Sequence, residues 1–294
     1  MPHTKQQIQG FLEEAGIRPR HRWGQNFLID LNLMRILAVS AGLQEDEAVL
    51  EVGCGTGSLT GLLAERAGAV VAVEIDPYLA GIARRELAEY ENVVVVEGDV
   101  LERKSRLNPV VLAALAAAWG EAKRDFKLVS NLPYQAASVL QVNLLVGGPR
   151  PAGMWVTVQR EVAERMIAGP GVKAYGLLSI LLQVTGEVKR LRRLGPEVFW
   201  PRPKVQSAMI EWRRDEEKIR RAGDVEQVKA VVDMLLGNRR KTIRNCLERA
   251  EGAGISVDDL ERLGIDPEER GERLGPEAYV QLAKVRAERS WGDG

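Results

Sequence analysis

Short apolar runs rich in β-branched residues alternate with helical segments from about residue 48 onward. Five of these runs are predicted to be strands, and they cover Ala48–Val52, Ala69–Glu74, Asn92–Glu97, Phe126–Ser130 and Met154–Gln159. Strands that alternate with helical segments are typical of a parallel sheet with helices on both faces. The pattern therefore predicts an α/β fold.

Two later apolar runs complete the predicted sheet. They are Leu177–Val184 and Val205–Trp212, with a more polar stretch between them. We expect the two runs to pair as a closing hairpin at one edge of the sheet. The sheet would then have seven strands, of which the last is antiparallel.

The chain changes character after Trp212. Residues 213–222 are dominated by charged side chains, which indicates a linker or a solvated helix. Helical segments follow near 224–237, 239–250, 256–264 and 276–289, with glycines between them. We therefore expect two domains, with the sheet in residues 1–214 and a small all-helical domain in residues 215–294.

The composition excludes several classes of protein. The chain has 294 residues and is 45% apolar, which is enough for one large core and a smaller second one. Acidic and basic residues balance at 41 each, so net charge alone argues for no particular partner. Two cysteines (Cys54 and Cys246) and two histidines (His3 and His21) predict neither a disulfide framework nor a metal site. Without a signal-peptide pattern or an apolar run of about 18 residues, we expect a soluble cytoplasmic protein with no membrane partner.

A glycine-rich loop follows the first predicted strand. Gly53, Gly55 and Gly57 allow a tight turn and a close approach of a ligand to the backbone. Glu74 ends the second strand, 21 residues after Gly53, at the position where a carboxylate meets ribose hydroxyls in nucleotide-binding sheets. Asp99 follows the third strand, where it could accept a hydrogen bond from an adenine amino group. These strand ends predict a nucleotide-like ligand; the alternative is that the glycines make only a structural turn.

The spacing of the glycines separates two kinds of nucleotide-binding enzyme. It is G-x-G-x-G, whereas the dinucleotide fingerprint is G-x-G-x-x-G, so an NAD-dependent oxidoreductase is the less favoured alternative. A nucleotide without a pyrophosphate needs no phosphate cradle. The pattern resembles S-adenosylmethionine-dependent methyltransferases. That resemblance implies S-adenosylmethionine as the cofactor and a Rossmann-like seven-stranded methyltransferase sheet.

A second candidate site is the turn Asn131–Tyr134, which reads Asn-Leu-Pro-Tyr directly after the fourth predicted strand. Ligands of open α/β sheets bind outside the carboxyl ends of the strands. The Asn131 side chain and neighbouring carbonyls could hold an exocyclic amino group, while Tyr134 could stack on its ring. Pro133 removes one backbone donor and stiffens the turn. The alternative is an ordinary turn with Tyr134 buried in the core.

Further motifs point to a narrower family. They are Gly24–Leu28, Gln159–Arg165 followed by Pro170-Gly171 and Tyr175–Ser179, Phe199–Val205, and Arg239–Arg244. Together with the turn at Asn131, they resemble the ribosomal RNA adenine N6-dimethyltransferase family, and most of all its bacterial small-subunit branch. The resemblance runs from about Ile17 to Leu247.

The resemblance implies roles for single residues. It places the cofactor among Asn26, Leu28, Gly53, Glu74, Asp99 and Asn131, with Gln25 ordering a lid over it. It places the target adenine against Asn131, Leu132 and Tyr134, with Phe199 stacking on the other side of the ring. Taken alone, Phe199 is more typical of a core residue.

Basic segments recur along the chain and predict contact with RNA. They are Arg18–Arg22, which forms an N-terminal basic arm, Lys189–Arg193, Arg202–Lys204 and Arg239–Arg244. Between Gly186 and Ala250 there are 17 Lys and Arg against 10 Asp and Glu. A single cluster is usually a solvated face, but several around one pocket are typical of a surface that follows RNA phosphates. We therefore expect the helical domain to contact RNA.

The predicted function is dimethylation of two adjacent adenosines in the 3′-terminal hairpin loop of 16S rRNA. The predicted substrate is the immature small ribosomal subunit, and the enzyme is expected to be a monomer. One alternative is a 23S rRNA adenine N6-methyltransferase of the macrolide-resistance type. Another is a ribosome assembly factor that has lost catalysis, although the intact glycine loop, Glu74, Asp99 and Asn131 argue against it.

Overall fold

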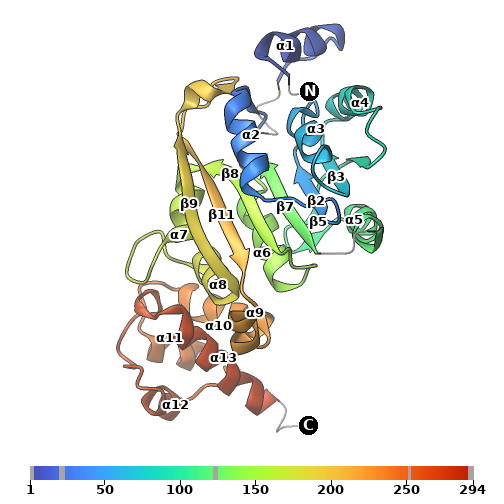
Figure 1. Cartoon of the computed structure of the whole chain (residues 1–294). Coiled ribbons are helices and arrows are strands. Elements are labelled where there is room, and N and C mark those ends of the chain that lie inside the picture. The colour runs from blue at the N-terminus through green and yellow to red at the C-terminus, as the bar shows by residue number, and fades with distance from the viewer. Residues whose placement is uncertain (1–2, 20–23, 122–124, 251–252, 291–294) are drawn as a thin grey trace. The chain divides into compact units, whose positions relative to one another are not determined.

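A computed structural model of the chain describes residues 3–19, 24–121, 125–250 and 253–290. Its main sheet has seven strands in the order β4-β3-β2-β7-β8-β11-β9 (Figure 1). The strands are β2 Ala48–Val52, β3 Ala69–Glu74, β4 Val93–Glu97, β7 Phe126–Asn131, β8 Gly153–Gln159, β9 Gly186–Leu194 and β11 Ser207–Arg214. The chain adds β3 and β4 on one side of β2, and then β7 and β8 on the other side. Such a reversal of strand order is where open α/β sheets bind ligands.

Strand directions and burial agree with an α/β sheet. Strands β2, β3, β4, β7 and β8 are parallel, and β11 lies antiparallel beside β8. Every residue of β2 and β3 is buried, as expected for parallel strands that are covered on both faces. The predicted α/β fold with seven strands and an antiparallel last strand is confirmed.

Helices connect and cover these strands. They are α1 Lys5–Glu14, α2 Leu31–Ser40, α3 Ser58–Ala64, α4 Pro77–Glu86, α5 Pro109–Glu121, α6 Ala137–Val146 and α7 Arg160–Ile167. Short strand pairs are β1 Phe27–Leu28 with β10 Phe199–Trp200, and β5 Leu101–Arg103 with β6 Arg106–Leu107. Asp30 caps α2 by accepting hydrogen bonds from two backbone N–H groups of its first turn, and Asp76 caps α4 by accepting one from the Tyr78 N–H. These carboxylates fix where the helices start beside the strand ends.

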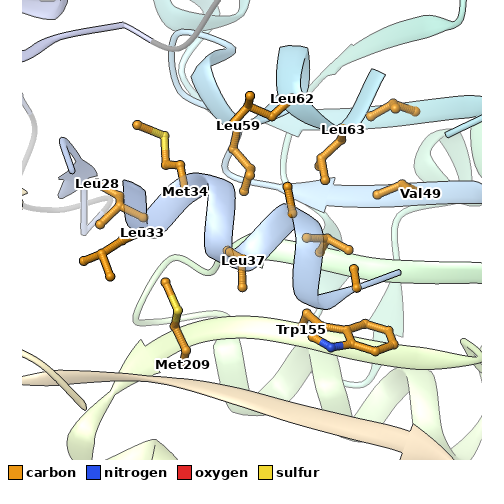
Figure 2. Packing of buried hydrophobic residues seen from close by; sticks show 14 of the residues in the cluster. Leu28, Leu33, Met34, Leu37, Val49, Leu59, Leu62, Leu63, Trp155 and Met209 are labelled. Carbon is orange, nitrogen blue, oxygen red and sulfur yellow. The ribbon is translucent and has the colours of Figure 1, made fainter. Parts of the chain in front are cut away.

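A large apolar cluster joins α2 and α3 to one face of the sheet (Figure 2). It contains Leu33, Met34 and Leu37 of α2, Leu59, Leu62 and Leu63 of α3, and Val49, Val129, Trp155 and Met209 of the sheet. Leu37 and Leu63 are fully buried. Burial of a leucine side chain contributes about 1.5–3 kcal/mol, so this cluster holds the helices firmly against the strands that carry the site.

The prediction of a strand at Leu177–Val184 is wrong, because these residues form helix α8, Leu177–Thr185. A continuous apolar run is compatible with a buried strand and with a buried helix, and periodicity cannot separate them. In α8, seven of the nine residues are buried, so the helix is apolar on nearly all sides. The Ser179 hydroxyl accepts a hydrogen bond from the Gly176 N–H and caps the helix start.

The edge strand beside β11 is instead β9, which comes from the polar stretch between the two apolar runs. Its side chains at Lys189, Arg190, Arg192 and Arg193 are exposed. Charged side chains are a common feature of edge strands because they oppose pairing with another sheet. Strand β9 was not predicted because its exposed side chains are charged. Such charge is typical of an edge strand.

The chain divides into two compact units. The sheet unit comprises residues 1–143, 151–163 and 189–213, and the helical unit comprises residues 144–150, 164–188 and 214–294. Besides α8, the helical unit contains α9 Glu216–Ala222, α10 Val225–Leu236, α11 Ile243–Arg249, α12 Val257–Arg262 and α13 Pro276–Ser290. The expected helices of residues 215–294 are therefore present, although the compact unit also takes in two earlier stretches of the chain.

Two buried tyrosines organise the helical unit. The Tyr175 hydroxyl donates to the Leu274 carbonyl at 3.0 Å, and the Tyr279 hydroxyl donates to the Gly271 carbonyl at 2.8 Å. Both rings are fully buried, so these hydrogen bonds satisfy hydroxyls that have no access to water. Within the described part of the chain, no helix has the length and apolar character needed to cross a bilayer.

Candidate active site at the carboxyl ends of the strands

A cavity of about 450 Å³ lies in the sheet unit, where β2, β3 and β7 end. It brings together eleven of the thirteen residues predicted for the site. They are Gln25, Asn26, Leu28, Gly53, Gly55, Glu74, Asp99, Asn131, Leu132, Pro133 and Tyr134. Gly57 and Phe199 are not among its lining residues. The strand ends and the segment before β1 therefore meet at one pocket.

Gly53 sits where the glycine loop and the Asn131–Tyr134 turn touch. Its φ of 79° is in the left-handed region, which glycine adopts without a steric cost. A β-carbon on Gly53 would lie 2.8 Å from Cγ of Pro133, so a side chain here would push the two loops apart. Two of the loops that line the cavity are thus packed directly on each other.

Gly57 has a structural role and does not line the cavity. It is the residue before α3, with a φ of 87°, and a β-carbon there would lie 2.9 Å from Cδ1 of Leu87. The predicted contact of Gly57 with the cofactor stays a prediction. Glycine is required at this position by the backbone and by the close packing of Leu87.

Glu74 links the glycine loop to the end of β3. Its Oε2 accepts a hydrogen bond from the Gly55 N–H at 2.8 Å, and its Oε1 accepts one from the Asp76 N–H at 3.0 Å. Burial raises the pKa of Glu74, while these two hydrogen bonds act in the opposite direction. Because each carboxylate oxygen has a further lone pair, Glu74 can still accept from a ligand hydroxyl.

Asp99 lies two residues beyond β4 and is followed by Val100, which also lines the cavity. The Oδ1 of Asp99 accepts a hydrogen bond from the Leu101 N–H at 2.9 Å, which fixes the carboxylate. Ile75 occupies the equivalent position after Glu74 and lines the cavity as well. Sequence reasoning missed this apolar pair, although its signal is simple: each residue directly follows a carboxylate at a strand end.

The side-chain amide of Asn131 is held in one orientation. Its Nδ2 donates to the main-chain carbonyl of Asn26 at 3.0 Å. Its Oδ1 is buried and has no hydrogen-bond partner in the structure. A buried acceptor without a donor costs about 1–3 kcal/mol, and such atoms call for an explanation. A donor from a bound ligand would satisfy it.

The rest of the turn is rigid. Leu132 is almost fully buried, and its N–H donates to the Thr157 carbonyl at 3.1 Å. The carbonyl of Pro133 accepts from the N–H groups of Ala136 and Ala137, both at 3.1 Å, which leads the chain into α6. The Tyr134 hydroxyl lies 3.2 Å from Oγ of Ser207, and burial raises the pKa of this tyrosine. Tyr134 is therefore a neutral ring at the cavity wall.

Phe199, predicted to stack on the target base, is not among the residues that line the cavity. The residue is 2% exposed and belongs to the same apolar cluster as Leu33 and Leu37, and it pairs with Leu28 in the short β1-β10 ladder. Its predicted contact with the target base stays a prediction. Its connection to the site passes through Leu28, which does line the cavity.

The N-terminal segment closes one side of the cavity through Ile8 of α1, which was also missed from the sequence. The main-chain N–H of His3 donates to Oγ of Ser58, and Nδ1 of His3 lies 3.0 Å from Oγ1 of Thr56. Burial lowers the pKa of His3. Gln25 donates to Oδ2 of Asp76 at 3.1 Å, which ties the segment before β1 to the start of α4.

Burial raises the pKa of two further groups at the cavity. Desolvation raises the pKa of Glu51 to about 8 and raises that of the Cys54 thiol well above its usual range. A protonated, buried thiol is a poor nucleophile, so Cys54 acts as a packing residue.

The predicted basic segments have different environments. The arm Arg18–Arg22 lies mostly outside the described residues, since positions 20–23 are not described. In the helical unit, Arg239 pairs with Glu272 at 3.2 Å, and Arg244 pairs with Glu268 at 2.6 Å. These two arginines are thus bound within the helical unit itself.

Comparison with known proteins identifies the family. The family described as Ribosomal RNA adenine dimethylase matches residues 16–288. A ribosomal RNA small subunit methyltransferase A from Rhodococcus erythropolis is 36% identical over 291 residues, which cover 94% of this chain and 91% of that protein.

Two solved structures are similar in fold. A dimethyladenosine transferase from Plasmodium falciparum has a TM-score of 0.72 at 22% identity, covering 89% of this chain and 97% of that one. The 23S rRNA methyltransferase ErmE has a TM-score of 0.62 at 25% identity, covering 89% of this chain and 99% of that one. The predicted methyltransferase type of sheet is confirmed by these neighbours. The chain belongs to the ribosomal RNA adenine dimethylase family.

Proposed function

We propose that this protein uses S-adenosylmethionine to dimethylate N6 of two adjacent adenosines in the 3′-terminal hairpin loop of 16S rRNA. The observation that carries the proposal is the buried, unpartnered Oδ1 of Asn131 at a cavity that also holds the glycine loop. An adenine amino group is a donor that would satisfy this atom. The family supports the reaction, and the identity to small-subunit methyltransferases supports the choice of RNA.

The cavity fits the cofactor of the family. Asn26, Leu28, Gly53 and Gly55 would lie along it, and Glu74 would accept from its ribose hydroxyls. Asp99 would accept from the adenine amino group, between the apolar side chains of Ile75 and Val100. Gln25 would keep the covering segment in place through Asp76. When bound, S-adenosylmethionine supplies an electrophilic methyl group on a sulfonium.

The residues of the turn would prepare the target nitrogen. The N6 lone pair of adenine is delocalised into its ring, which makes it a poor nucleophile. Hydrogen bonds from N6–H to Oδ1 of Asn131 and to the Leu132 carbonyl would favour a pyramidal nitrogen and localise that lone pair. No strong base is needed, since the nitrogen loses its proton easily once it carries the methyl group. Holding two reactants in line can supply roughly 7–11 kcal/mol of the barrier reduction.

Tyr134 would stack on the target base. Stacking of a nucleobase on an aromatic side chain is worth about 1–3 kcal/mol, and RNA-modifying enzymes read splayed bases in this way. Pro133 would stiffen the turn and keep Tyr134 in register with Asn131. Phe199 is buried in the core in this structure, and its stacking on the other face of the base remains part of the proposal.

The choice of the small-subunit RNA rests on the relatives. This chain is 36% identical to a small-subunit methyltransferase and 25% identical to a 23S rRNA methyltransferase. We further propose that the helical unit contacts the RNA, that the enzyme acts as a monomer on an immature subunit, and that it works in the cytoplasm, where subunits assemble. The 23S adenine remains the second candidate substrate.

Calorimetry with S-adenosylmethionine tests the cofactor part of the proposal. We expect saturable binding with one site per chain, and no binding of NADH under the same conditions. If the protein binds NADH and does not bind S-adenosylmethionine, the NAD-dependent oxidoreductase alternative would be favoured. No heat with either ligand would favour an assembly factor without catalysis.

A further inference from the structure

The glycine loop is anchored from two sides, and one of the anchors is His3. The first half of the loop is fixed at Gly55, whose N–H donates to Glu74. In the second half, Oγ1 of Thr56 lies 3.0 Å from Nδ1 of His3, and Oγ of Ser58 accepts from the His3 N–H at 3.0 Å. Thr56 and Ser58 line the cavity, whereas His3 does not. His3 therefore contacts the cofactor site through two of its lining residues.

The contacts of the His3 ring fix one tautomer. The residue is 6% exposed, and burial lowers its pKa against the opposing effect of Glu86, so the ring is neutral at neutral pH. Its Nε2 lies 3.5 Å from the Glu86 carboxylate of α4, which can only accept, so the proton belongs on Nε2. Nδ1 is then the acceptor, and the Thr56 hydroxyl donates to it. Each polar contact of the ring thus has a definite direction.

His3 also holds one end of α1. Thr4 caps this helix, so α1 begins two residues after His3. Ile8, in the first half of the helix, is 1% exposed, lines the cavity and packs in one apolar cluster with Leu79 and Ile82 of α4. The helix is therefore attached to the glycine loop at its start by His3, and to α4 by Ile8. Loss of the His3 contacts would loosen both the loop and this wall of the cavity.

We propose that His3 is a positioning residue for S-adenosylmethionine: it holds the second half of the glycine loop, and α1 beside it, in the arrangement that receives the cofactor. The inference rests on the proposed function, since it deepens the cofactor part of it. A site that is held in its bound arrangement beforehand loses less conformational freedom on binding and so binds more tightly. His3 should therefore act on cofactor affinity and leave the transfer step at Asn131 unchanged.

The test measures the dissociation constant of S-adenosylmethionine by calorimetry, in protein that carries its purification tag at the C-terminus. His3→Ala should raise this constant about 5- to 20-fold, because the contacts with Thr56 and Glu86 are both lost. Gln6→Ala changes an exposed residue of α1 and is the matched control, with a dissociation constant within about twofold of wild type. At saturating cofactor, kcat for methylation should stay within about twofold in both variants.

Two amide variants separate positioning of the loop from support of the fold. His3→Asn keeps a polar atom at the position of Nδ1, next to Thr56, and should bind the cofactor within about threefold of wild type. His3→Gln extends to the position of Nε2, next to Glu86, and should lose as much affinity as His3→Ala. Both variants remove the ring, so their comparison holds even where the alanine variant is too unstable to measure.

A double-mutant cycle with Thr56→Val tests whether His3 acts through Thr56. Valine keeps the shape of threonine and removes the hydroxyl that donates to Nδ1. In the Thr56→Val protein, His3→Ala should therefore raise the dissociation constant by no more than about threefold further. Residues that act through one contact are coupled in this way, whereas independent residues give additive effects. The same fold-loss in both backgrounds would overturn the inference.

The outcomes distinguish this inference from the proposed function. If His3→Ala binds S-adenosylmethionine as tightly as wild type, or if His3→Asn is as weak as His3→Gln, the positioning role is wrong. The proposed function is unaffected by either result, because it depends on methylation of small subunits by the wild-type protein. If the wild-type protein binds no S-adenosylmethionine, the proposed function fails and the positioning role fails with it.

Discussion

The side-chain nitrogen of Asn131 donates to the main-chain carbonyl of Asn26, and this bond leaves Oδ1 of Asn131 buried without a partner. A carbonyl can only accept, so the contact fixes which end of the amide faces the cavity. The two residues are 105 positions apart in the chain. The segment before β1 thus orients the atom that we propose to hold the target amino group.

Asn131→Ala should lower kcat for methyl transfer at least about 100-fold. Without Oδ1 of Asn131 to hold it, N6 of the target adenine no longer points at the methyl donor. The fold should persist, since the side chain is at the end of β7 and makes one hydrogen bond to Asn26. Single-turnover methylation of undermethylated small subunits measures the effect. An unchanged circular dichroism spectrum is the control. Full activity of the variant would refute the proposal that Asn131 holds the target amino group.

Glu74→Ala should weaken binding of S-adenosylmethionine by about 10- to 100-fold, from loss of charged acceptors for ribose and of the bond to the Gly55 N–H. Glu74→Gln is the matched comparison, because it keeps one acceptor oxygen and should lose less affinity. Calorimetric dissociation constants for both variants test this. An unchanged constant in Glu74→Ala would remove the residue from the ribose site.

Tyr134→Ala should raise KM for the RNA substrate about 5- to 150-fold, which corresponds to the loss of about 1–3 kcal/mol of base stacking. Tyr134→Phe keeps the ring and loses only the contact with Ser207, so its KM should stay within about threefold of wild type. The pair separates stacking from hydrogen bonding. Equal KM values for the alanine and phenylalanine variants would contradict a stacking role.

Glu51→Gln should stabilise the protein at neutral pH. Burial raises the pKa of Glu51 to about 8, whereas a carboxyl of the unfolded chain titrates near 4.3. The folded state therefore retains a proton that the unfolded state releases, and the wild-type protein loses stability as pH rises from about 4 to 8. The increase in free energy of unfolding from wild type to Glu51→Gln should be about 3 kcal/mol larger at pH 7 than at pH 4.

Urea unfolding of wild type and Glu51→Gln at both pH values measures this difference. The comparison uses free energies of unfolding without cofactor, so it does not depend on the role of the cavity. Other titrating groups contribute equally to both proteins and cancel. If wild type and Glu51→Gln differ in free energy of unfolding by the same amount at pH 4 and at pH 7, Glu51 ionises normally and the prediction is wrong.

Much of this fold follows from local pattern. The strands β2 and β3 begin and end where the apolar runs predict, and the strand-end residues Gly53, Glu74 and Asn131 come together because parallel strands finish at one edge of a sheet. Spacing along the chain was sufficient for this part of the site. It placed each functional residue just beyond a buried strand.

Other features depend on tertiary packing. The run Leu177–Val184 has no periodicity, so its helical state is decided by burial on all sides. Phe199 belongs to the motif Phe199–Val205, but it pairs with Leu28 and its side chain packs in the apolar cluster. Ile8 lines the cavity from α1, which meets the strand ends only in the folded chain. No local signal marks such positions.

The most direct test of the central claim is transfer of tritiated methyl groups to small subunits from a strain that lacks this modification, followed by mapping of the labelled nucleotides. The account predicts up to four methyl groups per subunit, all on N6 of two adjacent adenosines in the 3′-terminal hairpin loop of 16S rRNA. Label in 23S rRNA, at a base other than adenine, or in no RNA at all would contradict it.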